Sequence, residues 1–150
     1  MARCIILTPL YAGEELPWIA PQPGDFLICA DGGWARARQF GLTPQLVVGD
    51  FDSMPPAMRP DVPTLTLPTE KDDTDLVVCL HEGRKRGYTE FILAGAIGGR
   101  FDHTLSCLQC AADCALRGER ADDVPHLVAR ARVQAGRRLV EEEQLRRDDD

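Results

Sequence analysis

The sequence lacks the features that would assign it to several broad classes of protein. Acidic residues outnumber basic ones by 24 to 17, so there is no excess of positive charge for binding nucleic acid. No apolar run approaches the roughly 18 residues that a membrane-spanning helix needs. Neither the Walker pattern (GxxxxGK followed by Ser or Thr) nor the dinucleotide fingerprint GxGxxG occurs. We therefore expect no nucleic-acid partner and no membrane, in a 150-residue chain long enough for one hydrophobic core.

Zinc-site spacing is also lacking, although the chain has six cysteines. Three of them fall in separate apolar segments, where a free thiol behaves as a small hydrophobic side chain. The other three, in the stretch CLQCAADC, have i, i+3, i+7 spacing and would share one face of a helix. No fourth Cys or His lies nearby at ligand spacing, so the pattern favours packing over metal binding and indicates a reducing cytoplasm. The six are Cys4, Cys29, Cys79, Cys107, Cys110 and Cys114.

What the sequence does contain is a regular alternation of strand and helix patterns. Short apolar runs predict strands at 3–8, 25–30, 44–49, 64–68 and 90–96. Amphipathic stretches ending in glycine predict helices at 33–41, 72–87 and 102–118. Such alternation is typical of an α/β fold with an open, mostly parallel sheet and helices on both faces, a Rossmann-like three-layer arrangement.

Aspartates follow the predicted strands or open the helices that come after them. They are Asp31, Asp50 and Asp52 after two strands, and Asp72, Asp75 and Asp102 at the starts of two helices. The carboxyl ends of parallel strands share one edge, where open α/β folds bind ligands. Carboxylates that close together repel each other unless a cation lies between them, which favours a metal site. The alternative is that aspartate is simply a good cap and turn residue, which explains Asp72 well and Asp102 in part.

Glycine-rich loops at the same edge suggest that the metal serves a phosphate ligand. DGG at 31–33, which includes Gly33, and GAIGGR at 95–100 would let backbone N–H groups approach phosphate oxygens. Lys71 and Arg100 would supply positive charge. Ser53 either caps its loop or contacts a phosphate, and the sequence does not separate these roles. Oxygen donors beside phosphates indicate Mg²⁺.

Four motifs in this order, DGG, GDFDS, KDDTD and GGRFDH, resemble the catalytic domain of thiamin pyrophosphokinases. The resemblance covers residues 1–118 and implies transfer of a pyrophosphoryl group from ATP to thiamin, giving thiamin diphosphate and AMP. It implies that Asp50, Asp52 and Asp75 hold Mg²⁺, and that Asp31, Lys71, Asp72 and Thr74 line the phosphate and substrate site. It also implies that Arg100 and Asp102 lie near the reacting groups, with Asp102 orienting or deprotonating the thiamin hydroxyl. We therefore predict Asp31, Asp72 and Asp102 as catalytic, and Lys71, Thr74, Arg100, Gly33 and Ser53 as ATP-contacting residues.

Residues 119–150 depart from that resemblance. The family continues into a β-rich second domain that helps to bind thiamin and pairs two subunits, whereas this segment is rich in Arg, Glu and Asp without strand alternation. We expect a charged tail, helical or without ordered structure, in place of the second domain on which the family's homodimer depends. Two other functions stay open, a metal-dependent phosphoesterase and a nucleotide-binding protein without catalytic activity.

Overall fold

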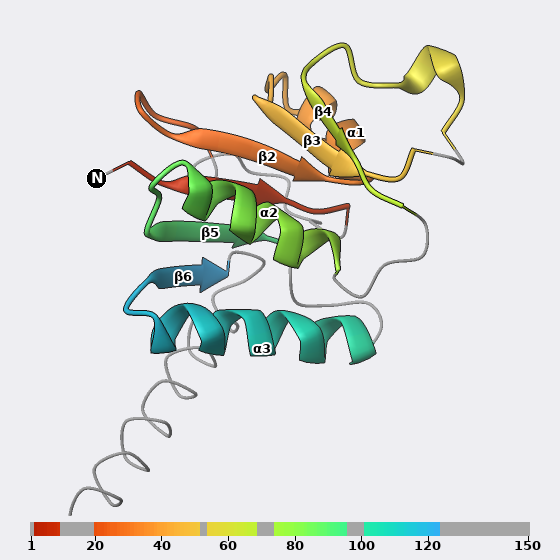
Figure 1. The fold of residues 1–150 in the computed structure, drawn as a ribbon. Coiled ribbons are helices and arrows are strands. Elements are labelled where there is room, and N and C mark those ends of the chain that lie inside the picture. The colour runs from red at the N-terminus through yellow and green to blue at the C-terminus, as the bar shows by residue number, and fades with distance from the viewer. Residues whose placement is uncertain (1, 10–19, 52–53, 69–73, 96–100, 124–150) are drawn as a thin grey trace, which may run out of the picture.

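The centre of the protein is a six-stranded sheet in which every strand pairs in parallel with its neighbours. The computed structural model describes residues 2–9, 20–51, 54–68, 74–95 and 101–123. The strands are β1 (Cys4–Leu7), β2 (Phe26–Ala30), β3 (Leu46–Gly49), β4 (Thr64–Thr66), β5 (Glu90–Ala94) and β6 (Arg120–Asp123). Their order across the sheet is β4-β3-β2-β1-β5-β6 (Figure 1). Because all strands run the same way, every strand ends at one edge, here called the carboxyl edge, and begins at the opposite amino edge.

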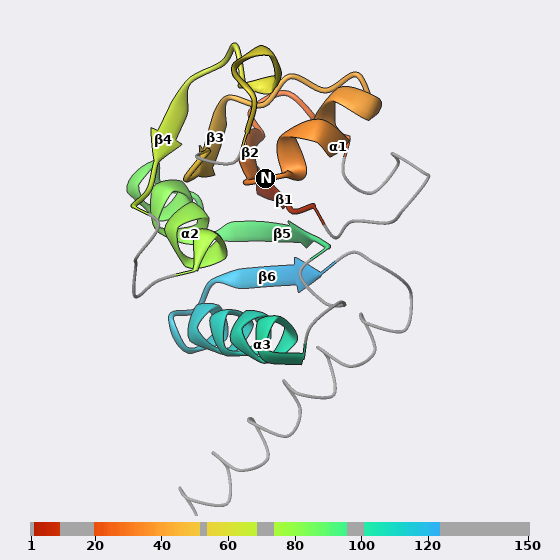
Figure 2. The same ribbon diagram turned by 90° about the vertical axis from the view of Figure 1, so that its right-hand side faces the viewer.

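Helices cover both faces of this sheet, as the sequence predicts. They are α1 (Gly33–Gln39), α2 (Asp75–Lys85) and α3 (Phe101–Leu116), with a short 3₁₀ turn at Pro56–Met58. Figure 2 shows α1 and α2 on opposite sides of the strands. One buried cluster joins α2 and α3 to residues such as Ile6 and Val48, and a second joins α1 to residues such as Ile5 and Val47. The alternation along β1 and β3 therefore fills two separate cores, which confirms the three-layer α/β fold.

The residues that we expected to be structural are buried. All six cysteines are free and buried, and Cys107, Cys110 and Cys114 of α3 belong to the core cluster shared with α2. This confirms that CLQCAADC faces inward. Burial raises the pKa of the Cys4 and Cys29 thiols to about 12, so neither titrates near neutral pH. Within the described segments, no helix has the length and apolar character needed to cross a membrane.

The sixth strand was not expected. We predicted no strand after Gly118, but Arg120–Asp123 pairs with β5, from Glu90 opposite Arg120 to Leu93 opposite Asp123. The prediction is therefore wrong for these four residues. A strand at the edge of a sheet is held by backbone hydrogen bonds on one side only and can carry charged side chains, so it needs no apolar alternation. Residues 124–150 lie outside the described part of the chain.

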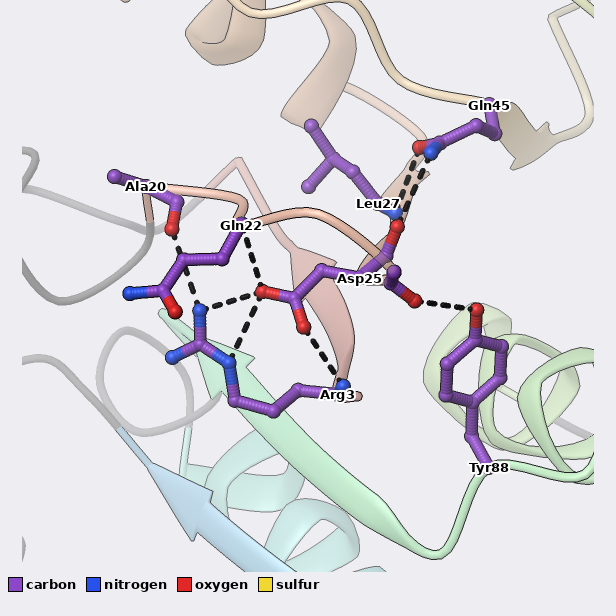
Figure 3. A network of polar contacts seen from close by, with 8 residues as sticks. Arg3, Ala20, Gln22, Asp25, Leu27, Gln45 and Tyr88 are labelled. Carbon is purple, nitrogen blue, oxygen red and sulfur yellow. Dashed lines mark hydrogen bonds and ion pairs between the residues drawn. The ribbon is translucent and has the colours of Figure 1, made fainter. Parts of the chain in front are cut away.

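The amino edge is held by a network around Asp25, far from the ends of the strands (Figure 3). The Asp25 carboxylate accepts hydrogen bonds from the Arg3 backbone N–H at 2.8 Å and from Arg3 Nη2 at 2.6 Å. The Gln45 side chain accepts from the Leu27 N–H at 2.8 Å. On the other side of the network, the Tyr88 hydroxyl donates to the Gly24 carbonyl at 3.0 Å. These contacts fix the starts of β1, β2 and β3 and leave the carboxyl edge available for a ligand.

Candidate functional site at the carboxyl edge

Four of the predicted acidic residues lie at the carboxyl edge. Asp31 follows β2 and Asp50 follows β3, while Asp75 and Asp102 lie in the first turns of α2 and α3, the helices that follow β4 and β5. Asp31 and Asp102 are exposed, and Asp50 and Asp75 are half-buried. The topology therefore brings carboxylates from four segments to one rim, as the strand-end argument predicts.

Asp31 and Asp50 lie on adjacent strands and are linked through Gly49. The Asp31 N–H donates to the Val48 carbonyl at 2.6 Å, which extends the β2–β3 pairing by one residue. A Cβ atom placed on Gly49 would lie 3.2 Å from Asp31 Oδ1, so the Asp31 carboxylate rests against the end of β3. The structure thus places the Asp31 carboxylate beside the residue that precedes Asp50.

The start of α2 is capped by Thr74 and not by an aspartate. The Thr74 hydroxyl accepts a hydrogen bond from the Val77 N–H at 3.4 Å, and Asp75 is the first helical residue. The expectation that the acids begin this helix at residue 72 is therefore wrong, since residue 74 has extended backbone angles. A hydroxyl one residue before the helix meets the free N–H groups without adding charge. Asp75 then lies where the helix dipole favours a negative group.

Asp102 lies on the other side of the switch point of the sheet. The chain proceeds from β1 through β2 and β3 to β4 in one direction and then places β5 and β6 on the far side of β1. Ligands of open α/β sheets bind where the strand order reverses, which here is between β1 and β5. Asp50 and Asp102 follow β3 and β5, which lie three strand spacings apart, about 14 Å. The rim therefore carries acidic residues on both sides of the switch point.

Thr8 joins the ends of β1 and β5 by hydrogen bonds at the switch point, a role that the sequence analysis missed. Its side chain is buried, and Oγ1 donates to the Gly95 carbonyl at 2.7 Å, while its N–H donates to the Ala94 carbonyl at 2.9 Å. Gly95 has a φ of +83°, which a side chain would disfavour, and it begins the glycine-rich loop after β5. The only signal in the sequence was a polar residue directly after a buried strand. Thr8 therefore fixes where that loop leaves the sheet.

Gly33 has a packing reason that is independent of any ligand. A Cβ atom at this position would lie 2.1 Å from the Leu7 carbonyl oxygen, so only glycine lets α1 approach β1 so closely. Trp34, the next residue, is 7% exposed and packs in the core with Ala37. A contact of Gly33 with ATP stays a prediction.

Five of the predicted site residues lie outside the described part of the chain. They are Asp52, Ser53, Lys71, Asp72 and Arg100. Among the residues that are described, no group of three or more His, Cys, Asp or Glu side chains is placed to hold a metal ion. Mg²⁺, however, commonly takes one or two carboxylates from the protein and its other oxygens from water or phosphate. Asp50, an oxygen donor at the end of β3, fits that requirement, and Asp31 lies at the end of the adjacent strand β2.

Comparison with known proteins connects this geometry to a family. The family described as "Thiamin pyrophosphokinase, catalytic domain" matches residues 22–121, which is more than half of the chain. No curated protein matches the chain significantly.

Solved structures show the same fold. A probable thiamine pyrophosphokinase from Staphylococcus saprophyticus subsp. saprophyticus is 27% identical with a TM-score of 0.64, over 83% of this chain and 65% of that protein. A thiamin pyrophosphokinase family protein from Enterococcus faecalis is 28% identical with a TM-score of 0.59, over 77% of this chain and 57% of that one. A thiamine pyrophosphokinase from Bacillus subtilis is 19% identical with a TM-score of 0.64, over 83% and 60%, and supports the fold alone. This chain spans less than two thirds of the length of these proteins, and by its match over residues 22–121 it belongs to the thiamin pyrophosphokinase catalytic-domain family.

Proposed function

We propose that this protein binds ATP with Mg²⁺ at the carboxyl edge and transfers the pyrophosphoryl group to thiamin, with AMP as the second product. The observation that carries the proposal is the family match over residues 22–121, which includes every strand of the sheet except β1 and the last two residues of β6. The acidic rim at the switch point agrees with it, because metal-assisted phosphoryl chemistry needs oxygen ligands where phosphates can be held. We place the protein in the cytoplasm, as its free cysteines suggest.

Each rim residue has a role in this proposal. Asp50, with Asp52 and Asp75, would hold Mg²⁺, which when bound neutralises charge on the phosphate oxygens. Asp31 and Asp72 would orient the groups around the phosphates. The remaining contacts to ATP would come from Lys71, Thr74, Arg100, Gly33 and Ser53. Such transfer depends mainly on position and on charge neutralisation, so these residues need only hold the two substrates in line.

The two sides of the switch point would then bind different substrates. Asp31 and Asp50 lie beside β2 and β3, where we place the ATP phosphates with their cation. Asp102 lies in the first turn of α3, the helix that follows β5 on the other side of the switch point, where we place the thiamin hydroxyl. At that position Asp102 would accept a hydrogen bond from the hydroxyl and take its proton as the hydroxyl oxygen bonds to the β-phosphorus of ATP. The bond from that phosphorus to the oxygen bridging to the α-phosphorus would break, and AMP would leave. The extended triphosphate would lie across the carboxyl ends of β2 and β1, between the two sides.

Binding and transfer can be separated in this chain. The match to the S. saprophyticus protein covers 65% of that protein, and its remaining part is a candidate for completing the thiamin pocket. A more open pocket holds a small ligand less tightly and admits water to the reacting phosphate. We therefore expect ATP with Mg²⁺ to bind to the 150-residue chain, and thiamin to be converted slowly or not at all.

Calorimetry with MgATP, followed by product analysis with thiamin present, tests the proposal. Asp50→Asn should weaken MgATP binding by at least about tenfold, because losing a hydrogen-bonded charged partner costs about 1.5–3 kcal/mol. Asp113→Asn, near the end of α3 that leads to the start of β6, is the matched control and should bind normally. AMP formed only with thiamin supports the transferase, whereas inorganic phosphate as the product would indicate a phosphoesterase. Wild-type protein that binds no MgATP would refute the proposal. Binding without any product, even after fusion to the part of the S. saprophyticus protein that this chain does not match, would favour a non-catalytic nucleotide-binding protein.

A further inference from the structure

Two residues of the rim have backbone angles that side chains disfavour. Among the described residues, only Asp31 and Phe51 are non-glycine residues with positive φ, at 46° and 59°. Aspartate tolerates this left-handed region better than most residues, whereas a bulky aromatic residue is rarely found there. Asp31 directly follows β2, and Phe51 lies two residues after the end of the adjacent strand β3. Strained backbone of this kind persists only when the surrounding structure holds it in place.

Phe51 is held by its ring. The side chain is 7% exposed and belongs to the core cluster that joins α1 to the sheet, together with Cys29 and Val47. Burying an aromatic ring stabilises a position by more than the left-handed angle costs it. The ring therefore fixes a sharp turn of the chain immediately after Asp50. This turn separates Asp50 from Asp52 in the sequence GDFDS.

Gly49 supplies the space that Asp31 occupies. A Cβ atom here would lie 3.2 Å from Asp31 Oδ1, 3.3 Å from Asp31 Cα and 3.5 Å from Phe51 Cε1. The first two separations are tighter than ordinary van der Waals contact, so an added methyl group would displace the Asp31 carboxylate. Because the Asp31 N–H is also bonded to Val48, the backbone of Asp31 cannot follow such a shift freely.

We propose that Gly49 and Phe51 are positioning residues that preorganise the carboxylates of Asp31 and Asp50 for ATP and the cation that accompanies it. Gly49 does so by having no side chain, and Phe51 does so by anchoring the turn in the core. Neither residue touches the ligand in this proposal. The inference rests on the proposed function, and it adds that the affinity of the rim for MgATP depends on two apolar residues beside the acids.

The test compares MgATP affinity with folding stability in two glycine variants. Gly49→Ala should raise the Kd for MgATP at least about tenfold, which corresponds to about 1.4 kcal/mol. Its crystal structure should show the Asp31 carboxylate moved away from the end of β3. The matched control is Gly83→Ala in α2, where a Cβ atom would lie 2.7 Å from Phe91 Cε1 and 2.9 Å from Cys4 Sγ. That variant should unfold at a lower urea concentration than the wild type and keep the wild-type Kd.

A second pair of variants tests the anchor at Phe51. Phe51→Leu keeps an apolar side chain in the core and should retain a Kd within about threefold of the wild type. Phe51→Gly removes the strain of the positive φ but also the anchor, and should raise the Kd by at least about tenfold. If Gly49→Ala does not fold, the two Phe51 variants still test the positioning role. Across the glycine and Phe51 variants, we expect the loss of MgATP affinity not to follow the loss of folding stability.

Each outcome separates this inference from the proposed function. Wild-type affinity in folded Gly49→Ala, or in both Phe51 variants, would overturn the inference and leave the proposed function standing. An unmoved Asp31 carboxylate in the Gly49→Ala crystal structure would overturn it as well. Wild-type protein that binds no MgATP would refute the proposed function, and the inference with it.

Discussion

Replacing Asp25 by Asn should destabilise the protein without affecting the carboxyl edge. The Asp25 side chain is 2% exposed and that of Arg3 is 23% exposed, so the pair is largely shielded from water. Asp25 accepts four hydrogen bonds, three from Arg3 and one from the Gln22 N–H (Figure 3). Asn keeps the size but presents an NH₂ group to these donors and leaves the Arg3 charge without its partner. Breaking a buried pair costs about 3–5 kcal/mol, and the partial exposure of Arg3 lowers our expectation to about 2–3 kcal/mol.

The free-energy cost of Asp25→Asn should become smaller as the pH falls. Burial alone would raise the pKa of Asp25, but its hydrogen bonds and charge pairing with Arg3, together with the Gln22 N–H, outweigh this and lower the pKa below its ordinary value of 3.8. A carboxyl group whose pKa is lowered by folding stabilises the native state above its unfolded pKa, and this contribution is lost as the pH falls through the folded pKa. The difference between wild type and Asp25→Asn should therefore be full at pH 7 and shrink below about pH 4.

Urea unfolding followed by circular dichroism at pH 7 and at acidic pH measures both effects. Asp113→Asn is the control, since Asp113 is 47% exposed and pairs with Arg117 and with Arg84, which keeps its other partner Glu119. It should cost about 1 kcal/mol or less. The reasoning would be refuted if Asp25→Asn costs no more than Asp113→Asn at pH 7. It would also be refuted if the cost of Asp25→Asn is as large in acid as at neutral pH. MgATP affinity should be unchanged in both variants.

Three further predictions concern stability and reactivity. Thr8→Val should cost about 1–3 kcal/mol in urea unfolding, because it leaves the Gly95 carbonyl without its buried donor, while Thr8→Ser should cost less. Thr74→Ala should cost about 0.5–1 kcal/mol through loss of the cap to Val77, and Thr74→Ser should restore it in the same measurement. The six buried thiols should not react with a disulfide reagent at pH 8 in the native protein, and all six should react in denaturant; fast reaction of the native protein would contradict their burial.

The sequence predicted the sheet well because its inner strands are buried on both faces. Continuous apolar runs such as Cys4–Leu7 and Phe26–Ala30 have that property. Gly41, whose φ is +68°, indicated where α1 ends, and the helix stops two residues earlier at Gln39. The edge strand β6 escaped prediction because its four residues include three charged ones, and a strand paired on one side needs no apolar face. A periodic pattern of apolar residues detects buried side chains, whereas β6 is held mainly by backbone hydrogen bonds to β5.

The acids of the rim were predictable by position, and their supporting contacts were not. A parallel sheet places every residue that follows a strand at one edge, so Asp31 and Asp50 could be assigned to the same site from the sequence. The contact of Asp31 with Gly49, and the positive φ of Phe51, depend on how two strand ends meet in space. The pair of Arg3 and Asp25 joins residues 22 apart and has no local signature in the sequence either.

The position of β1 at the centre of the sheet determines the order in which the protein can fold. β1 pairs with β2 on one side and with β5 on the other. The hydrogen bond from Thr8 to Gly95 joins residues that are 87 positions apart. Closing a loop of that length costs about 3 kcal/mol of chain entropy more than closing a loop of about four residues, so this pairing forms late. On the ribosome, β5 follows β1 by roughly 4–17 s, and until then the apolar strand β1 has one unpaired side. A nascent chain that stalls before Glu90 therefore exposes the strand edge at the middle of the future core, where pairing with another such chain leads to aggregation.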